Sequence, residues 1–274
     1  MSEDNVPKDI EGPETPPPAS PESKQRDASL MAHTSPISKR VKKIHEDNAS
    51  KKMKFNARDA LFEYIEMPEK FSTSTVLYYN EKFVVIRDKF PKSSLHLLLL
   101  PRNREKTWIH PIAVFDDTEF LEEVRTEARK VGKLAASELR RLHGKYSAAE
   151  QARQVAMSAD PPPDELPEGR DWEQELQYGI HAGPSMNNLH VHIMSVDRNG
   201  PCLKHRKHYN SFSTPFFVPL GDFPLSPEDK RRTSMVANYL QEDLICWRCG
   251  ENFGNAFTKL SAHLKQEFEE WRRI

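Results

Sequence analysis

Two histidines, His190 and His192, alternate with apolar residues in the sequence NLHVHIM. Side chains at two-residue spacing share one face of a β-strand, so Asn188 and the two histidines form a polar row while the residues between them pack beneath. A neutral imidazole can attack phosphorus and form a phosphoramidate that water later cleaves, and its neighbours can stabilise phosphate charge. The row therefore indicates nucleophilic phosphate chemistry, although an exposed or metal-binding sheet face would give the same pattern.

A second group of chemically active residues has the spacing of a zinc finger. Cys246 and Cys249 are followed after thirteen residues by His263, and Glu267 comes four positions later. On a helix His263 and Glu267 lie one turn apart and can reach one metal, and a carboxylate is an acceptable zinc ligand. The spacing predicts a structural zinc site that supplies much of the module's folding free energy, with no organic cofactor. In the alternative, Glu267 is a surface acid and water completes the site.

Basic residues lie close to both groups. The stretch from Lys204 to His208 follows the histidine row, and Trp247 and Arg248 stand between the cysteines. Lys and Arg bind phosphates and an aromatic ring can stack on a base. We therefore expect Lys204, Lys207, His208, Trp247 and Arg248 to contact DNA, the alternative for the first stretch being a solvated basic loop.

The elements that position these residues can be read from the apolar periodicity. Strands are expected at about 76–79, 83–87, 95–100, 175–182 and 187–196, with another near TPFFVPL. A core-facing helix is expected over 117–143 and a short one after Phe55, ending near Pro68. The segment 145–172, with Pro161 to Pro163, is expected to be a mobile insertion. Together these elements predict an α+β antiparallel sheet with flanking helices, and a small C-terminal module.

The chain ends differ from its middle. Residues 1–38 are rich in Pro, Ser, Glu and Asp, which predicts a disordered tail. The sequence KRVKKIHEDNASKKMK, residues 39–54, resembles a bipartite nuclear import signal, with a solvated charge run or phosphate-binding arm as the alternative. The predicted division is a tail at 1–54, a catalytic domain at 55–225 and a finger module at 226–274.

Composition limits the function only loosely. The formal net charge of the 274 residues is -1, but the basic residues are bunched, so this value neither supports nor excludes nucleic acid. Two of the three cysteines have metal-ligand spacing, which favours a reducing compartment, and Cys202 is expected to be an ordinary buried thiol. The start of the chain lacks the features of a signal peptide and no apolar run is long enough to span a bilayer. We expect a soluble nuclear protein.

Three longer stretches carry a family resemblance. HAGPSMNNLHVHIMSVD, PCLKHRKHYNSF and FVVIRDKFPKSSLHLLLLPR, with the finger, resemble the aprataxin branch of the histidine-triad superfamily over roughly residues 55–272, apart from the insertion. Glu in the last ligand position is similar to some fungal members. The resemblance implies a DNA-repair hydrolase that removes AMP from 5′-adenylated DNA ends left by aborted ligation, through a covalent nucleotidyl-histidine. Nucleotide caps on 3′ ends are a further implied substrate.

The resemblance also implies residue roles. The middle position of the signature, His190, is the nucleophile, and His192 binds and polarises the phosphate. His181 is a further active-site histidine. Asn188 replaces the first histidine, and we expect its amide to fix the tautomer of the nucleophilic ring, so that activity is retained.

The remaining roles concern nucleotide and DNA binding. The backbone N–H groups of Ser185 and Met186 are expected to hold phosphate oxygens. Asp88 matches the acid that holds the ribose hydroxyls, and His96 lines the same pocket. Lys92 reaches phosphate or is a solvated turn lysine. Phe55 is the candidate for stacking on the terminal base.

Two other functions use the same residues. A small-molecule hydrolase of dinucleoside polyphosphates would need the histidines but neither the finger nor the basic stretch. A non-catalytic DNA-end binder is suggested by Asn188. The expected partners are DNA ends and nicks, and repair proteins that bind the N-terminal tail. We expect no association with a membrane, and we expect the protein to be a monomer.

Overall fold

The computed structural model describes residues 56–274, which belong to one compact unit, Phe55–Ile274. The predicted tail, the basic segment 39–54 and Phe55 lie outside the described residues. The division into domains at residues 54 and 225 stays a prediction. Among the described residues no helix has both the length and the apolar composition to cross a membrane.

The fold is built on an antiparallel sheet of six strands in the order β1-β2-β3-β5-β4-β6. The strands are β1 (Val76–Tyr79), β2 (Phe83–Arg87), β3 (His96–Pro101), β4 (Leu176–His181), β5 (Val191–Ser195) and β6 (Phe217–Pro219). This confirms the predicted α+β class. The predicted strand 187–196 is shorter than expected, because Asn188 to His190 precede β5 in irregular backbone.

The helices cover both faces of the sheet. They are α2 (Phe62–Glu66), α3 (Pro111–Val114), α4 (Thr118–His143), α5 (Ala148–Met157), α6 (Arg206–Ser213), α7 (Val236–Tyr239) and α8 (Phe257–Trp271). Single 3-10 turns are η1 (Ala57–Asp59), η2 (Pro68–Lys70), η3 (Lys106–Trp108), η4 (Gly144–Tyr146), η5 (Leu220–Asp222) and η6 (Lys230–Arg232). The basic stretch from Lys204 to His208, predicted to contact DNA, is helical from Arg206 onward, as part of α6.

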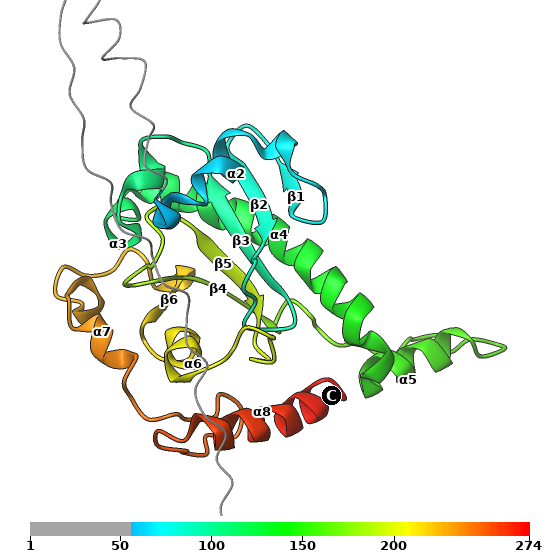
Figure 1. Cartoon of the computed structure of the whole chain (residues 1–274). Helices are drawn as coiled ribbons and strands as arrows, with labels where there is room; N and C mark the ends of the chain where they lie inside the picture. Colours follow the sequence, from blue (N-terminus) through cyan, green and yellow to red (C-terminus); the bar gives the residue numbers. More distant parts are fainter. Residues whose placement is uncertain (1–55) are drawn as a thin grey trace, which may run out of the picture. The chain divides into compact units, whose positions relative to one another are not determined.

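The long helix α4 decides which sheet face can hold the polar row. Asp117 caps it by accepting a hydrogen bond from the Phe120 N–H (3.1 Å). Figure 1 shows α4 lying along one face of the sheet, and its buried apolar residues share a core with the strands. Because side chains alternate along β3, Leu97 and Leu99 join this core while Leu98 packs on the opposite face with Ile65 of α2. His96 shares the face of Leu98, so the histidines lie on the face away from α4.

The segment 145–172, for which the sequence predicted a mobile insertion, projects from the sheet in Figure 1 and is attached to the rest of the fold at both ends. It contains η4 and α5, and the Ser147 hydroxyl caps α5 by accepting a hydrogen bond from the Glu150 N–H. Trp172 is buried in the main core, the apolar cluster formed by α4 and the sheet, and its Nε1–H donates to Glu150 Oε1 (3.0 Å). The Ala148 N–H donates to the Arg273 carbonyl (2.8 Å) beyond α8. The first end of the segment is thus fixed to the residues after α8, and the second end is fixed by Trp172 in the core.

The C-terminal module has a small core of its own. Its buried members are Tyr209, Leu244, Cys246, Leu260 and Leu264. Tyr209 comes from α6, and its hydroxyl donates to the Ile245 carbonyl (2.8 Å) and accepts from the Trp247 N–H (2.9 Å). The helix α6 is therefore shared between this module and the sheet.

Candidate active site and metal site

Four histidines meet on the sheet face away from α4. They are His96 on β3, His181 at the end of β4, His190 just before β5 and His192 on β5, and we call them the imidazole cluster. Ring centroids are 5.1 Å apart for His96 and His192, 4.6 Å for His181 and His192, and 5.0 Å for His190 and His192. His190 is 6% exposed, and His96 and His192 are each 4% exposed. Burial lowers the pKa of all four rings, which keeps them neutral.

The contacts of His190 leave one of its nitrogens free to react. Nδ1 lies 2.7 Å from the Asn188 main-chain carbonyl, and because a carbonyl oxygen only accepts, Nδ1 carries the proton. In a neutral ring Nε2 then has the lone pair that a nucleophile needs. The tautomer is thus fixed by the main chain of Asn188. The predicted role of its side-chain amide is wrong, since both amide atoms are buried and have no partner among the described residues.

A second chain of hydrogen bonds sets the tautomer of His192. The Lys92 N–H donates to His96 Nδ1 (3.2 Å), so the proton of neutral His96 is on Nε2. That nitrogen donates to His192 Nδ1 (2.9 Å) and faces Asp88 Oδ2 at 3.4 Å. His192 therefore carries its proton on Nε2, a buried atom without a partner in residues 56–274. A buried N–H donor of this kind is suited to an incoming anionic oxygen.

Asp88, His96 and His192 could also be read as metal ligands, because their ligand atoms lie within 4.8 Å of one another. Two of those atoms, His96 Nε2 and His192 Nδ1, are already satisfied by the hydrogen bond between them. The tautomer chain accounts for both atoms, so we assign this group to proton positioning.

Two residues that shape the cluster were missed in the sequence. The Phe212 ring on α6 lies edge-on to His192 (5.0 Å, 90°) and close to His181 (4.5 Å). Arg198 is buried, and its backbone adopts the left-handed conformation (φ 48°). Its guanidinium donates to the Phe212 carbonyl and to Gln177 Oε1 (2.8 Å). Neither residue belongs to an alternating motif, and no helix was predicted over Arg206–Ser213, the helix that carries Phe212.

The loops around the cluster place the predicted nucleotide-binding residues. Ser185 is exposed, and its carbonyl accepts from Arg58 Nε (2.9 Å), while Met186 packs beside α2. Lys92 is 9% exposed and donates from Nζ to the Phe90 carbonyl, so it is not the solvated turn lysine of one prediction. Burial lowers its pKa, against the opposing effect of Asp88. The phosphate and ribose roles of Ser185, Met186, Asp88 and Lys92 stay predictions.

The backbone that holds Lys92 is fixed from the other side by Gly200. The Gly200 N–H donates to the Lys92 carbonyl (3.1 Å), and the Cys202 N–H donates to the Pro91 carbonyl (3.1 Å). A Cβ at position 200 would lie 2.4 Å from the Lys92 carbonyl carbon. Glycine is therefore required for this close approach. Cys202 is half-buried rather than fully buried as predicted.

The predicted metal ligands come together in the C-terminal module. The ligand atoms of Cys246, Cys249, His263 and Glu267 lie within 4.8 Å of one another. His263 Nε2 is 3.2 Å from Cys249 Sγ and 3.1 Å from Glu267 Oε1. Two thiol sulfurs, an imidazole and a carboxylate form a donor set that zinc accepts. Glu267 is thus part of the cluster, and its other oxygen is held by Arg248 Nη1 at 2.6 Å.

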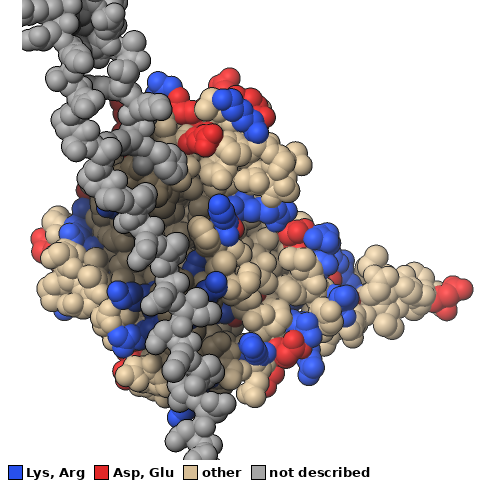
Figure 2. Space-filling model, viewed as in Figure 1, with Lys and Arg blue, Asp and Glu red and all other residues tan. Residues whose placement is uncertain are grey.

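The predicted DNA-contact residues have different surroundings. Lys204 and Lys207 are exposed, and Figure 2 shows Lys and Arg side chains around α6 on the face in view. His208 is half-buried against His205, with ring centroids 3.5 Å apart, and burial lowers its pKa to about 4. Trp247 packs against the main core and the small core, and Arg248 pairs with Glu267 and Glu270. Their contacts with DNA stay predictions.

Comparison with known proteins agrees with both parts of the geometry. Residues 69–199 match the HIT domain, and residues 213–270 match the C2HE / C2H2 / C2HC zinc-binding finger. An aprataxin-like protein of Schizosaccharomyces pombe is 39% identical over 231 residues, which are 83% of this chain and 88% of the relative.

The chain belongs to the aprataxin family.

Other relatives support this membership. The aprataxin-like protein of Saccharomyces cerevisiae is 35% identical over 77% of this chain and 95% of its own length. The crystal structure of the aprataxin ortholog Hnt3 in complex with DNA has a TM-score of 0.64 at 37% identity, covering 79% of this chain and 96% of that one. The predicted resemblance to fungal aprataxins, with a histidine-triad domain and a zinc-binding finger, is confirmed.

The neutral imidazole cluster has a consequence for stability. Burial lowers the pKa of His96 from its ordinary 6.5 to about 4, so acid protonates the unfolded chain before the folded one. The contribution of this ring is complete above pH 6.5 and is lost as the pH falls toward 4, by about 3 kcal/mol in total. Denaturant unfolding from pH 7.5 to 5 should show a steep loss of unfolding free energy. The loss should be shallower for His96→Asn, and equal slopes would contradict the assignment.

Proposed function

We propose that this aprataxin-family chain is a DNA-repair hydrolase that removes AMP from 5′-adenylated DNA ends. The observation that carries the proposal is the pair of fixed tautomers in the imidazole cluster. His190 presents a lone pair at Nε2 and His192 presents a proton at Nε2. One nitrogen can attack an electrophilic phosphorus while the other binds the oxygen on which charge accumulates.

The reaction proceeds in two steps. His190 Nε2 bonds to the phosphorus of the AMP group, and the bond from that phosphorus to the anhydride oxygen breaks, leaving a 5′-phosphate on the DNA. The ring gains positive charge, and its Nδ1–H donates to the Asn188 carbonyl, which stabilises that charge. Water then attacks the same phosphorus, the P–N bond breaks, AMP leaves and the proton of water passes to the surroundings.

The remaining active-site residues bind and orient the substrate. Asp88 holds the ribose hydroxyls, and His181, whose Nε2 is buried without a partner among the described residues, contacts the phosphate. The backbone at Ser185 and Met186 supplies further N–H donors, and Lys92 adds positive charge close to His96. Nucleotide caps on 3′ ends are a second substrate, because the same phosphorus chemistry applies.

DNA lies along the basic surface of α6 and the finger. The Hnt3 structure in complex with DNA supports DNA binding by this similar chain, and the exposed Lys204 and Lys207 support this placement. Lys204 and Lys207 bind backbone phosphates, and zinc bound by the Cys246 to Glu267 cluster stabilises the fold of the module. The protein acts in the nucleus, which the basic segment 39–54 supports, as a monomer whose N-terminal tail binds repair partners.

The substrate class can be tested with the purified full chain. We expect AMP release from 5′-adenylated nicked DNA at a kcat/KM at least about 100-fold above that for a dinucleoside polyphosphate, because only DNA engages the basic surface. Chromatography of released AMP measures both reactions. Release from the dinucleoside polyphosphate alone would identify a small-molecule hydrolase, and release from neither would identify a DNA-end binder.

A further inference from the structure

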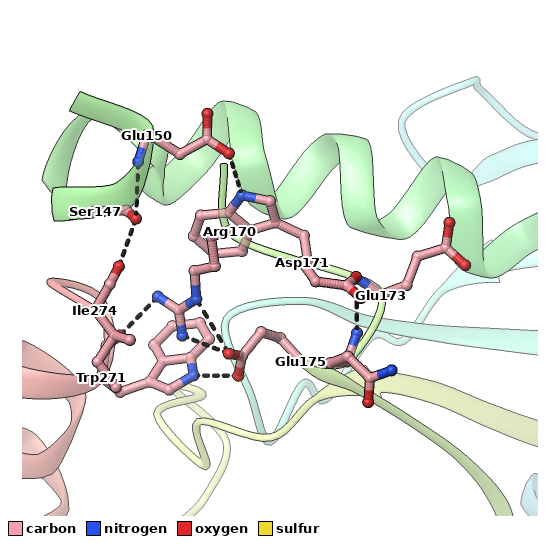
Figure 3. A network of polar contacts seen from close by, with 10 residues as sticks. Ser147, Glu150, Arg170, Asp171, Glu173, Glu175, Trp271 and Ile274 are labelled. Carbon is pink, nitrogen blue, oxygen red and sulfur yellow. Dashed lines mark hydrogen bonds and ion pairs between the residues drawn. The ribbon is translucent and has the colours of Figure 1, made fainter. Parts of the chain in front are cut away.

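A buried arginine joins the last turn of α8 to the sheet. The Arg170 side chain is 4% exposed and lies between two indole rings, 4.5 Å from the centroid of Trp172 and 4.8 Å from that of Trp271. Its guanidinium donates to Glu175 Oε1 (2.8 Å) and to the Trp271 carbonyl (2.7 Å), as Figure 3 shows. We call Arg170, Trp172, Glu175 and Trp271 the C-terminal anchor.

The anchor continues into the strands beside the imidazole cluster. Glu175 Oε2 accepts a hydrogen bond from Trp271 Nε1 (2.6 Å), and Glu175 directly precedes β4. Its carbonyl accepts from the Val196 N–H (3.1 Å), at the end of β5. The indole of Trp271 is therefore attached through Glu175 to the ends of the strands that carry His181 and His192.

A buried histidine at the end of α4 provides a second route to the same strands. The His143 ring lies edge-on to Phe268 (5.5 Å) and Trp271 (5.4 Å) of α8. Its Nε2 is 3.1 Å from Ser94 Oγ, and the Ser94 N–H donates to Asp197 Oδ1 (3.0 Å). Ser94 precedes β3 and Asp197 follows β5. The helix α8 is therefore attached to the six-stranded sheet at two neighbouring points, through Glu175 and through His143.

The segment 145–172 completes the anchor from outside. Ser147 Oγ donates to the Ile274 carbonyl, and the Ala148 N–H donates to that of Arg273. The Arg272 guanidinium stacks on Tyr146, 4.0 Å from the ring centroid. These contacts engage the residues that follow Trp271, so the segment and the sheet hold α8 from two sides (Figure 3).

The position of this anchor on α8 gives it a functional meaning. Trp271 lies one helical turn after Glu267 and two turns after His263, both members of the metal-ligand cluster. We propose that Arg170 is a positioning residue, which fixes the DNA-holding finger relative to His190. This inference rests on the proposed function. Loss of the guanidinium would leave Glu175 Oε1 and the Trp271 carbonyl without their partner, and the orientation of α8 would be less firmly fixed.

The test uses the zinc-loaded full chain with Arg170→Met, which keeps much of the side-chain length but removes the charge and the donors. We expect KM for 5′-adenylated nicked DNA to rise about tenfold, with kcat changed less than about threefold, because binding energy is lost while the imidazole cluster is intact. Trp271→Phe removes the indole donor to Glu175 but keeps an aromatic ring, and it should shift KM in the same direction by a smaller factor. Arg129→Met, on the exposed side of α4, is the matched control.

Fluorescence anisotropy with unadenylated nicked DNA separates this inference from the proposed function. The Kd of Arg170→Met should rise about tenfold while its metal content equals that of the wild type. If the wild type released no AMP, the proposed function would fail, but this comparison of Kd values would still decide the role of Arg170. Unchanged KM and Kd, or a fall in kcat without a change in either, would overturn the inference.

Discussion

Replacement of His190 with alanine is expected to reduce AMP release from 5′-adenylated DNA by roughly 10⁴-fold or more, since the covalent step loses its nucleophile. The hydrogen bond from His190 Nδ1 to the Asn188 carbonyl supports this expectation, because it leaves the lone pair on Nε2 free to attack phosphorus. DNA affinity should change less than about threefold, because the ring is 6% exposed and offers little surface to the DNA backbone.

A matched control is available at an exposed histidine. His110 caps α3 by accepting from the Ile112 N–H, and asparagine can replace it at a helix N-terminus. His110→Asn should therefore keep wild-type turnover. Retention of turnover within tenfold by His190→Ala would show that another group attacks the phosphorus.

Loss of the metal is expected to unfold the finger, because its buried core consists of five residues and a structural zinc contributes on the order of 10 kcal/mol to folding. Cys246→Ser should bind less than one metal per chain and lose helical circular dichroism from α8. Since Trp271 belongs to the main core, the melting temperature of the whole unit should fall as well.

The role of Glu267 is tested by the same measurements. Glu267→His should keep one metal per chain, because imidazole is also a zinc ligand, whereas Glu267→Ala should lose it. Cys202→Ser, outside the cluster, should leave the metal content unchanged. Full metal content in Glu267→Ala would assign the fourth position to another ligand.

The sequence predicted the features that depend on local pattern. The helix over 117–143 begins at its Asp117 cap, and β1 and β2 have the bounds expected from their β-rich runs. The metal ligands follow from spacing alone, since two residues one turn apart on α8 necessarily share a face.

The features that depend on tertiary contacts could not be predicted. The carbonyl of Asn188 fixes His190 only because the chain leaves strand geometry there, where the Leu189 N–H donates to the Thr107 carbonyl (2.7 Å). Arg170 lies in a segment whose prolines and charges predicted a mobile insertion. Its partner Trp271 is about one hundred residues away along the chain, so the contact leaves no local pattern. A buried arginine between two indoles has no periodic signal in a sequence.

The most direct measurement is to locate the covalent intermediate. The full chain would be mixed rapidly with 5′-adenylated nicked DNA labelled in the AMP group, denatured at alkaline pH to preserve a phosphoramidate, and digested for peptide mass spectrometry. The structure predicts AMP on His190, and no adduct in His190→Ala. AMP attached to another residue, or turnover by the wild type without any nucleotidyl-histidine, would contradict the assignment of His190 as the nucleophile.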